Sequence, residues 1–263
     1  MCKVAVFIPT YRPGGIDVFE ASLARQTREP DWIFVADELE REEAWSSVVE
    51  YLTISTKMLH PKKSLGDIRN LAKAYNEAAH QCLVEDIDLL ISLQDYIWAP
   101  PNGIERFVEI YEKSSTSLIT GLTHISKDPY PEDIYDLVGD YTIFDEPFRG
   151  KPLEIDWHDV RDASIYNNEA PVFEASPEHW EANWAAIPTT VFEKGVRWDT
   201  DYDKGIAYEN IDFAKQAQKE GYNVLLDTQN VAISLPHKKY WPREEIEIKK
   251  YSNRWMHDAK WDN

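Results

Sequence analysis

Polar side chains that can bind a cation or a phosphate follow three apolar runs of this chain. The runs are residues 3–9 (KVAVFIP), 32–36 (WIFVA) and 88–93 (DLLISL), and the residues after them are Thr10, Tyr11 and Arg12, then Asp37, then Gln94 and Asp95. Carboxylate and amide oxygens are ligands for Mg²⁺, and a guanidinium pairs with phosphate oxygens. Asp95 is therefore a candidate metal ligand, although an Asp at this position also fits a simple turn.

The hydrophobic pattern predicts the elements that position these side chains. Apolar, β-branched runs predict strands, and apolar residues at helical spacing predict amphipathic helices. The predicted strands are residues 3–9, 32–36, 51–55, 88–93 and 118–122, and the predicted helices are 16–26, 65–82 (with Ser64 as its cap), 103–113 and 208–220. This alternation is typical of an α/β protein with a parallel sheet, in which ligands bind at the carboxyl ends of the strands. The three polar ends should therefore meet at one edge.

The second half of the chain is less regular. Residues 124–177 are rich in acidic, aromatic and proline residues with little periodicity, which is more typical of a functional or mobile segment than of a core. Residues 223–237 predict two short strands that end at His237, and residues 243–261 predict a charged helix with aromatic anchors. We expect one domain over residues 1–263, with abutting halves at 1–123 and 124–240 and a helical tail at 241–263.

Composition narrows the class of protein. With 47 acidic and 28 basic residues the formal net charge is −19, so the surface repels phosphate backbones and nucleic acid is a poor default partner. No apolar run reaches the roughly 18 residues of a membrane-spanning helix, and the apolar start lacks the cleavage site of a signal peptide. The two cysteines, Cys2 and Cys82, give no disulfide framework. We expect a cytoplasmic protein.

Six segments, taken in order, resemble those of family 2 glycosyltransferases, which have the GT-A fold. They are VAVFIPTYRP, FVADE, LGDIRNLAKAYNEA, LQDYIWAPP, EANWAAIPTTVFEKGVRWDTDY and YENIDFAKQAQKEGYNV. The resemblance covers about residues 3–237 and weakens over 124–177. It implies a Rossmann-like nucleotide-binding half at 1–123 and a smaller acceptor-binding half at 124–240. The implied reaction is inverting transfer of a sugar from a nucleotide-diphosphate donor, expected to be a UDP-sugar, to an acceptor hydroxyl.

The resemblance also implies which residues hold the donor nucleotide. They are Pro9, Thr10, Tyr11, Arg12, Asp37, Arg69 and Gln94. Asp37 would accept an N–H of the base, and Arg69 would meet carbonyl or phosphate oxygens. Without the resemblance, Asp37 is interpreted as a turn residue at a strand end and Arg69 as an exposed helix residue. Lys62 and Lys63 could reach phosphates, but such lysines are more often solvated.

Asp95 and His237 match the family's ligands for Mn²⁺ or Mg²⁺, which act as a Lewis acid on the departing diphosphate. The family often has Asp-x-Asp where this chain has Leu93, Gln94, Asp95 and Tyr96, so only the middle carboxylate is present. Gln94 offers an amide oxygen, which is a weaker ligand. The departure puts the affinity and geometry of the metal site in doubt.

The acceptor hydroxyl needs a general base, which the family takes from a Glu-Asp pair. This chain has Glu209 and Asn210 there, with Asp212 two residues further, so Glu209 is the first candidate and Asp212 the second. Acids at a helix N-terminus also stabilise the helix by about 0.3–1 kcal/mol without any catalysis. For the donor sugar or acceptor, the matching residues are Asn183, Trp184 and Trp98, with Trp180 and Trp198 nearby. Large aromatics are, however, mainly core residues.

Two other hypotheses stay open beside the glycosyltransferase. A degenerate relative would bind a nucleotide or glycan without turnover, which Leu93, Tyr96 and Asn210 motivate. A nucleotidyltransferase would need a glycine-rich basic loop, and residues 9–15 (PTYRPGG) have one Arg and no Lys signature. The expected partners are a nucleotide-sugar donor and an acceptor that the sequence does not specify: a glycan, lipid, protein or modified base.

Overall fold

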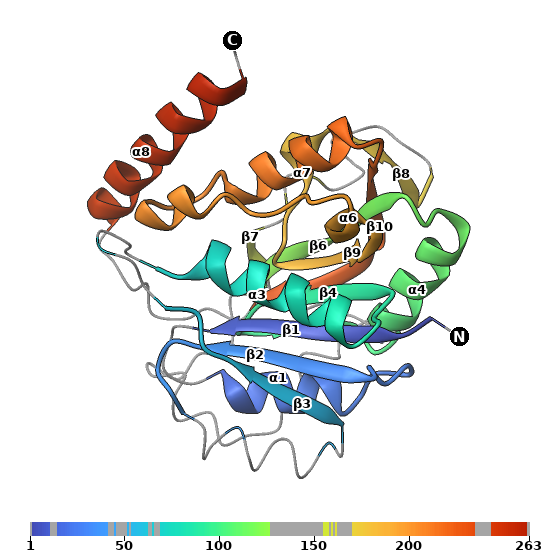
Figure 1. Cartoon of the computed structure of the whole chain (residues 1–263). Coiled ribbons are helices and arrows are strands. Elements are labelled where there is room, and N and C mark those ends of the chain that lie inside the picture. Colours follow the sequence, from blue (N-terminus) through green and yellow to red (C-terminus); the bar gives the residue numbers. More distant parts are fainter. Residues whose placement is uncertain are drawn as a thin grey trace.

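The computed structural model describes residues 2–10, 15–41, 45, 52, 54–62, 65, 69–126, 155–157, 159, 161, 170–234 and 243–261. Its centre is a ten-stranded sheet of order β3-β2-β1-β4-β9-β6-β10-β5, with β7 paired to β6 and β8 paired to β10 (Figure 1). The strands are β1 (Val4–Thr10), β2 (Trp32–Asp37), β3 (Ser55–Leu59), β4 (Leu89–Leu93), β5 (Ile97–Trp98), β6 (Ser117–Ser126), β7 (Ile155–Trp157), β8 (Val172–Ala175), β9 (Trp184–Pro188) and β10 (Asn223–Ser234).

The N-terminal part of the sheet is parallel, as the sequence predicts. Strands β3, β2, β1 and β4 pair in parallel, with α1 (Ile16–Leu23) between β1 and β2 and α3 (Leu71–Val84) between β3 and β4. Beyond β4 the sheet is mixed, because β9 runs antiparallel to both β4 and β6, while β6 pairs in parallel with β10. The carboxyl ends of β1, β2 and β4 therefore lie side by side.

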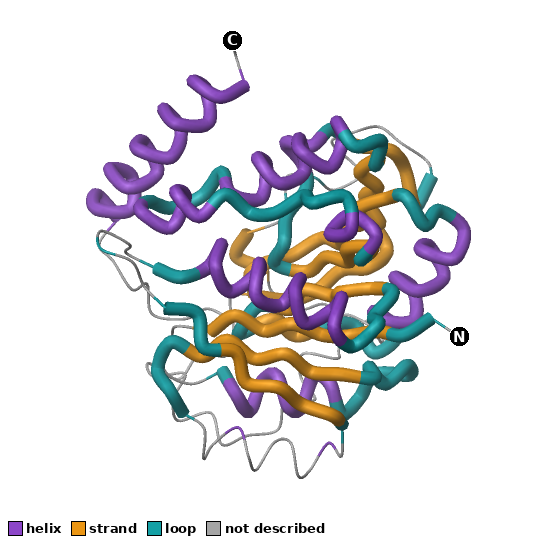
Figure 2. The backbone as a smooth tube through the Cα atoms, viewed as in Figure 1, coloured by secondary structure: helices purple, strands orange, loops and turns teal. Residues whose placement is uncertain are grey.

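Helices cover both faces of the sheet, which explains why β1 is buried along its whole length (Figure 2). On one face α3, α6 (Thr190–Glu193) and α7 (Glu209–Lys219) pack on strand residues such as Phe7 and Phe34. On the other face α1 and α4 (Gly103–Lys113) pack on alternate residues such as Val6 and Ile33. The result is a three-layer α/β/α arrangement.

The helix predicted from Leu65 begins at Leu71 instead. A distant carboxylate sets this start: the buried Asp203, in the 3₁₀ helix η5 (Thr200–Lys204), accepts hydrogen bonds from the backbone N–H groups of Ala72 (2.8 Å) and Lys73 (3.2 Å). Free N–H groups at a helix start need such acceptors. The predicted cap Ser64 lies outside the described residues.

Two strand predictions are also wrong in their bounds. The third strand is Ser55–Leu59 rather than residues 51–55. The segment predicted as two short strands is the single strand β10, with a register shift between Asp227 and Val231. Its polar DTQN sequence is typical of a turn but forms a β-bulge. In this bulge the buried Asp227 accepts hydrogen bonds from Arg106 at 2.9 and 2.6 Å.

The predicted tail helix is confirmed as α8 (Arg243–Trp261). It packs on η5, where the Nδ2 of Asn253 donates to the carbonyl oxygens of Tyr202 (3.0 Å) and Ala207 (2.9 Å). Another 3₁₀ helix, η4 (Pro177–His179), lies against α7. No helix in the described ranges has the length and apolar character needed to cross a membrane.

Candidate active site

The polar residues at the strand ends lie together at one edge of the sheet. Thr10 and Asp37 are register partners at the ends of β1 and β2. The Oγ1 of Thr10 donates to the Oδ2 of Asp95 at 3.0 Å, and Arg41 donates to the same Thr10 oxygen at 3.1 Å. Asp95 is buried, with 3% of its surface exposed. The convergence expected from the strand pattern is therefore present, and it includes Arg41, which the sequence did not single out.

Asp37 is already saturated by hydrogen bonds from its own chain. Its Oδ1 accepts from the backbone N–H of Leu39 (2.9 Å) and from Arg41 Nη2 (3.2 Å). Its Oδ2 accepts from the Arg41 backbone N–H (3.3 Å), Arg41 Nε (2.8 Å) and Trp45 Nε1 (2.9 Å). A carboxylate offers about four lone-pair sites. A nucleobase N–H would therefore have to displace one of these donors.

These donors also determine the pKa of Asp37. Burial acts to raise this pKa, but the hydrogen bonds from Arg41, Leu39 and Trp45 outweigh it and hold the pKa below its ordinary value. A carboxyl group with a depressed pKa stabilises the folded chain above its ordinary pKa and loses that contribution as the pH falls.

We expect Asp37→Asn to lower the free energy of unfolding at pH 7 by about 1–3 kcal/mol, because hydrogen bonds to a charged group are lost. Because the pKa of Asp37 is depressed in the folded chain, the difference between the two proteins should shrink as the pH falls below the ordinary pKa of 3.8. Urea unfolding at pH 7, 4.5 and 2.5 would measure it. A difference that does not change with pH would contradict the role given to the charge.

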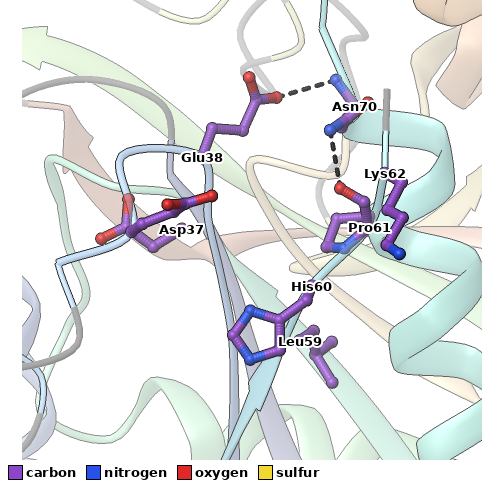
Figure 3. A pocket seen from close by; sticks show the side chains of 8 residues that line it. Asp37, Glu38, Leu59, His60, Pro61, Lys62 and Asn70 are labelled. Atoms are coloured by element: carbon purple, nitrogen blue, oxygen red, sulfur yellow. Dashed lines mark hydrogen bonds between the residues drawn. The ribbon is translucent and has the colours of Figure 1, made fainter. Parts of the chain in front are cut away.

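A first cavity of about 400 Å³ opens beside Asp37, at the ends of β2 and β3; we call it the Asp37 cavity (Figure 3). Its side chains include Glu38, His60, Lys62 and Asn70. The Asn70 backbone N–H donates to Glu38 at 2.8 Å, and its Nδ2 donates to the Pro61 carbonyl at 2.9 Å. Hydrogen bonds thus tie the segment before α3 to the ends of β2 and β3.

A second cavity of about 380 Å³ lies at the N-terminus of α7; we call it the Glu209 cavity. Arg69 and Glu209 line it and form an ion pair of 2.7 Å, with side chains only 10% and 5% exposed. Other lining residues include Gln94, Asn183 and Lys250. Arg69 is therefore not the exposed helix residue of the plainer interpretation, and Glu209 is not only a helix-start acid.

The backbone that presents Glu209 is unusual. Ala207 and Tyr208, which also line the Glu209 cavity, have positive φ angles of 65° and 71°. Non-glycine residues adopt such angles at a cost of order 1–3 kcal/mol, and they concentrate at functional sites. The Asn253 hydrogen bond to the Ala207 carbonyl helps to hold this turn from α8.

A second carboxylate, Glu181, lines the Glu209 cavity and was missed from the sequence. Burial raises the pKa of its carboxyl group, and the negative charges of Glu209 and Asp159 act in the same direction while Arg161 opposes them. The only available signal was its position in the WEANW segment, where Asn183 drew attention instead. Asn183 does line the cavity.

Asp212, the second candidate for the base, lies in a different environment. It is fully buried and accepts hydrogen bonds from Gln216 (2.7 Å) and from two residues of α8, Lys260 (3.0 Å) and Trp261 (2.7 Å). It does not line the Glu209 cavity. Its contacts give it the role of an anchor for α8.

The aromatic candidates for sugar stacking are core residues in this structure. Trp98 and Trp184 are each 1% exposed, and Trp180 and Trp198 are buried as well. The Nε1 of Trp184 donates to Asn230 at 2.9 Å, and Arg25 covers the ring of Trp98 at 4.9 Å. Such burial leaves no ring face exposed in this structure, and the assignment of Trp98 and Trp184 to a sugar site stays a prediction.

The metal hypothesis depends on Asp95 and His237, of which the structure describes only Asp95. Asp95 is in place, but His237 lies outside the described residues, as do Tyr11, Arg12 and Lys63. Within the described part of the chain, no three His, Cys, Asp or Glu side chains gather where a metal ion could be held. Asp95 and the Thr10 hydroxyl alone do not make a metal site, so the described donors do not yet fit the ion. Pro9, which was predicted to hold the nucleotide, lies in β1 and pairs with Ala36 inside the sheet.

Comparison with known proteins identifies the fold. The chain matches no protein-family model and no curated protein sequence. It resembles the crystal structure of residues 1–349 of TarS from S. aureus in complex with UDP-GlcNAc, with a TM-score of 0.58 and 11% identity over 90% of this chain and 59% of that one. The UDP complex gives 0.57 and 11% over 89% and 60%, and a further TarS structure gives 0.58 and 10% over 89% and 37%. The chain thus spans about three-fifths or less of these neighbours, with which it shares the fold.

Proposed function

We propose that this chain is a glycosyltransferase of the GT-A type, which moves a sugar from a nucleotide-diphosphate donor, expected to be a UDP-sugar, to an acceptor hydroxyl. One observation carries the proposal. At the carboxyl edge of the sheet, the Glu209 cavity combines an Arg69 guanidinium with carboxylates and amides, in a fold shared with a protein crystallised with UDP-GlcNAc and with UDP. The acceptor class stays open.

We propose that the donor binds across the two cavities. Asn70 lines the Asp37 cavity, whereas its neighbours Arg69 and Leu71 line the Glu209 cavity, so the cavities flank one short segment. We assign the nucleoside to the Asp37 cavity and the diphosphate and sugar to the Glu209 cavity. In the second cavity Arg69 and Lys250 supply positive charge, which a protein with a net charge of −19 must concentrate locally to hold a diphosphate.

The reaction expected there is a single displacement with inversion. The acceptor oxygen forms a bond to the anomeric carbon as the bond from that carbon to the diphosphate breaks. The Arg69 guanidinium would stabilise the negative charge that grows on the departing diphosphate. Glu209 would orient Arg69 through their 2.7 Å ion pair. The sequence assigned the removal of the acceptor proton to Glu209, with Asp212 second.

Metal assistance is a separate proposal, with Asp95 and His237 as the ligands of Mn²⁺ or Mg²⁺. A bound ion would neutralise diphosphate charge. The step above is assigned to Arg69, and the metal proposal is tested separately.

The competing hypothesis is a protein that binds the nucleotide without turnover. The ion pair of Glu209 with Arg69 favours it, because that Glu209 oxygen already accepts a hydrogen bond from the guanidinium. Asn210 favours it as well, since an amide cannot take a proton at neutral pH. Donor binding is common to both hypotheses, and turnover separates them.

Thermal unfolding with added nucleotide tests the donor site. UDP at about 100 times its dissociation constant should stabilise the native chain by about 2.7 kcal/mol and raise Tm by roughly 5–10 °C. GDP, CDP and TDP serve as comparison ligands, each with and without Mn²⁺, and Asp95→Ala tests the metal. No shift with any diphosphate at millimolar concentration would overturn the donor site. UDP release from UDP-GlcNAc or UDP-glucose then distinguishes the enzyme from the degenerate binder.

A further inference from the structure

We propose that Glu181, rather than Glu209 or Asp212, takes the proton of the acceptor hydroxyl. The inference rests on the proposed function and concerns the same site. Glu181 and Glu209 line the same cavity, so either is placed to face a reacting sugar. They differ in what already binds them.

The other two carboxylates are occupied. Glu209 accepts from Arg69 at 2.7 Å, and both side chains are nearly buried. Asp212 accepts from Gln216, Lys260 and Trp261 and lies outside the cavity. At Glu209 the oxygen that faces Arg69 is therefore already occupied, and at Asp212 both oxygens are.

The Glu181 carboxylate is available. Among the described residues, none donates a hydrogen bond to it or forms an ion pair with it, and only its backbone carbonyl is bonded, by the Thr120 hydroxyl at 3.0 Å. The side chain is partly exposed, and it lines the Glu209 cavity between the fully buried Trp180 and Ala182. An acceptor hydroxyl in the cavity can therefore hydrogen-bond to it without displacing a protein group.

Hydrogen bonds hold the backbone next to Glu181 in place. The Ala182 carbonyl accepts from the Ser92 hydroxyl and from the Tyr75 hydroxyl (3.2 Å), and the Asn183 carbonyl accepts from the Gln94 backbone N–H (3.1 Å). These bonds tie residues 181–183 to β4 and α3, which are core elements. The core thus fixes the backbone that carries Glu181.

The surroundings also suit a base. Burial raises the pKa of Glu181, Glu209 and Asp159 raise it further, and Arg161 lowers it. Arg69 and Lys250 are the cations that share the cavity with it. A carboxylate with a raised pKa accepts a proton more readily, and two carboxylates held in contrasting environments are a usual way to divide catalytic roles.

In the step, the acceptor oxygen bonds to the anomeric carbon and the acceptor proton passes to a Glu181 oxygen. The bond between the anomeric carbon and the diphosphate oxygen breaks, and its electron pair leaves with UDP. Protonation of Glu181 at low pH removes the base. The acid limb of kcat/KM should therefore have its midpoint above the ordinary glutamate pKa of 4.5.

The test uses UDP release from UDP-GlcNAc and from UDP-glucose, with water as the acceptor, because water needs a base. Glu181→Gln should lower UDP release by about 10²–10⁴-fold. Its Tm shift with UDP should stay that of the parent. Azide carries no proton to remove, so UDP release with azide as the nucleophile should be similar in Glu181→Gln and the parent. Glu174→Gln, a change at an exposed acid of β8 outside the cavity, is the matched control and should leave release unchanged.

The outcomes distinguish a failure of the Glu181 assignment from a failure of the proposed function. If the parent releases UDP and Glu181→Gln releases it equally fast, Glu181 is not the base and the glycosyltransferase proposal stands. If Glu181→Gln loses water and azide reactions alike, the residue has a positioning role and the inference also fails. If the parent binds UDP but releases none from either sugar nucleotide, the proposed function fails, and the inference fails with it.

Discussion

Replacement of Arg69 by methionine is expected to lower the free energy of unfolding by about 3–5 kcal/mol, because it leaves the Glu209 charge buried without a partner. The ion pair is short, at 2.7 Å, and its two side chains are 10% and 5% exposed. Water at the cavity wall would therefore replace the lost guanidinium only in part. Urea unfolding of the purified variant would measure the loss.

The double variant Arg69→Met with Glu209→Gln should recover most of that stability, because neither charge is then left unpaired. Arg254→Met is a suitable control, since Arg254 is 65% exposed and its 3.6 Å pair with Asp258 should contribute at most about 1 kcal/mol. If Glu209→Gln restores nothing, the cost does not arise from an unpaired charge. The double variant should nevertheless lose the UDP-dependent rise in Tm, which separates the binding role of Arg69 from its structural one.

Asp212→Ala is expected to lower the free energy of unfolding by about 2–3 kcal/mol and to loosen α8. The side chain has no exposed surface, and its loss leaves Trp261 without its acceptor and Lys260 paired with Asp199 alone. The expected loss is smaller than at Arg69, because the Lys260 side chain is 35% exposed and water can solvate its ammonium group. Urea unfolding gives the stability, and limited proteolysis should show faster cleavage within residues 243–261.

Asp258→Ala serves as the matched control on α8 itself, since that carboxylate is 46% exposed. It should change neither the unfolding midpoint nor the cleavage rate appreciably. If Asp212→Ala leaves α8 as resistant as in the parent, the anchoring role given to Asp212 is wrong.

The sequence pattern predicts the elements where local information is sufficient. Residues 3–9, 32–36 and 88–93 are apolar runs that end in polar residues, and they form β1, β2 and β4 with their ends side by side. The amphipathic tail is helical from Arg243 to Trp261, as its periodicity indicates. Pairing in parallel follows from the alternation of strands and helices, so the edge that carries the candidate site was predictable.

The errors occur where a distant residue decides the local structure. The start of α3 is set by Asp203, whose carboxylate lies 131 positions further along the chain than Ala72. The polar stretch in β10 is accommodated as a bulge because Arg106 and Trp184 bind it from other elements. Neither partner can be identified from the periodicity of its own segment.

The same limit applies to the site. The chemistry of single residues indicates Arg69 and Glu209 as site candidates. It could not show that they form an ion pair, because they lie 140 positions apart in the sequence. It could not show that Asp37 is saturated by Arg41 and Trp45, nor that no described residue donates to the Glu181 carboxylate in the same cavity. Nor could it distinguish a tryptophan that stacks on sugar from one that fills a core, because the side chain is the same.

The first turn of α7 has a consequence for the order of events during synthesis. Its Glu209 faces the cavity, while its Asp212 needs Trp261, which is added to the chain 49 positions later. At a synthesis rate of about 5–20 residues per second, that interval is roughly 2–10 s. Throughout it the α7 turn carries a carboxylate without its final donors, so this half of the nascent domain should complete its folding last. The N-terminal strands β1, β2, β3 and β4 pair with one another in parallel, and all four are synthesised much earlier.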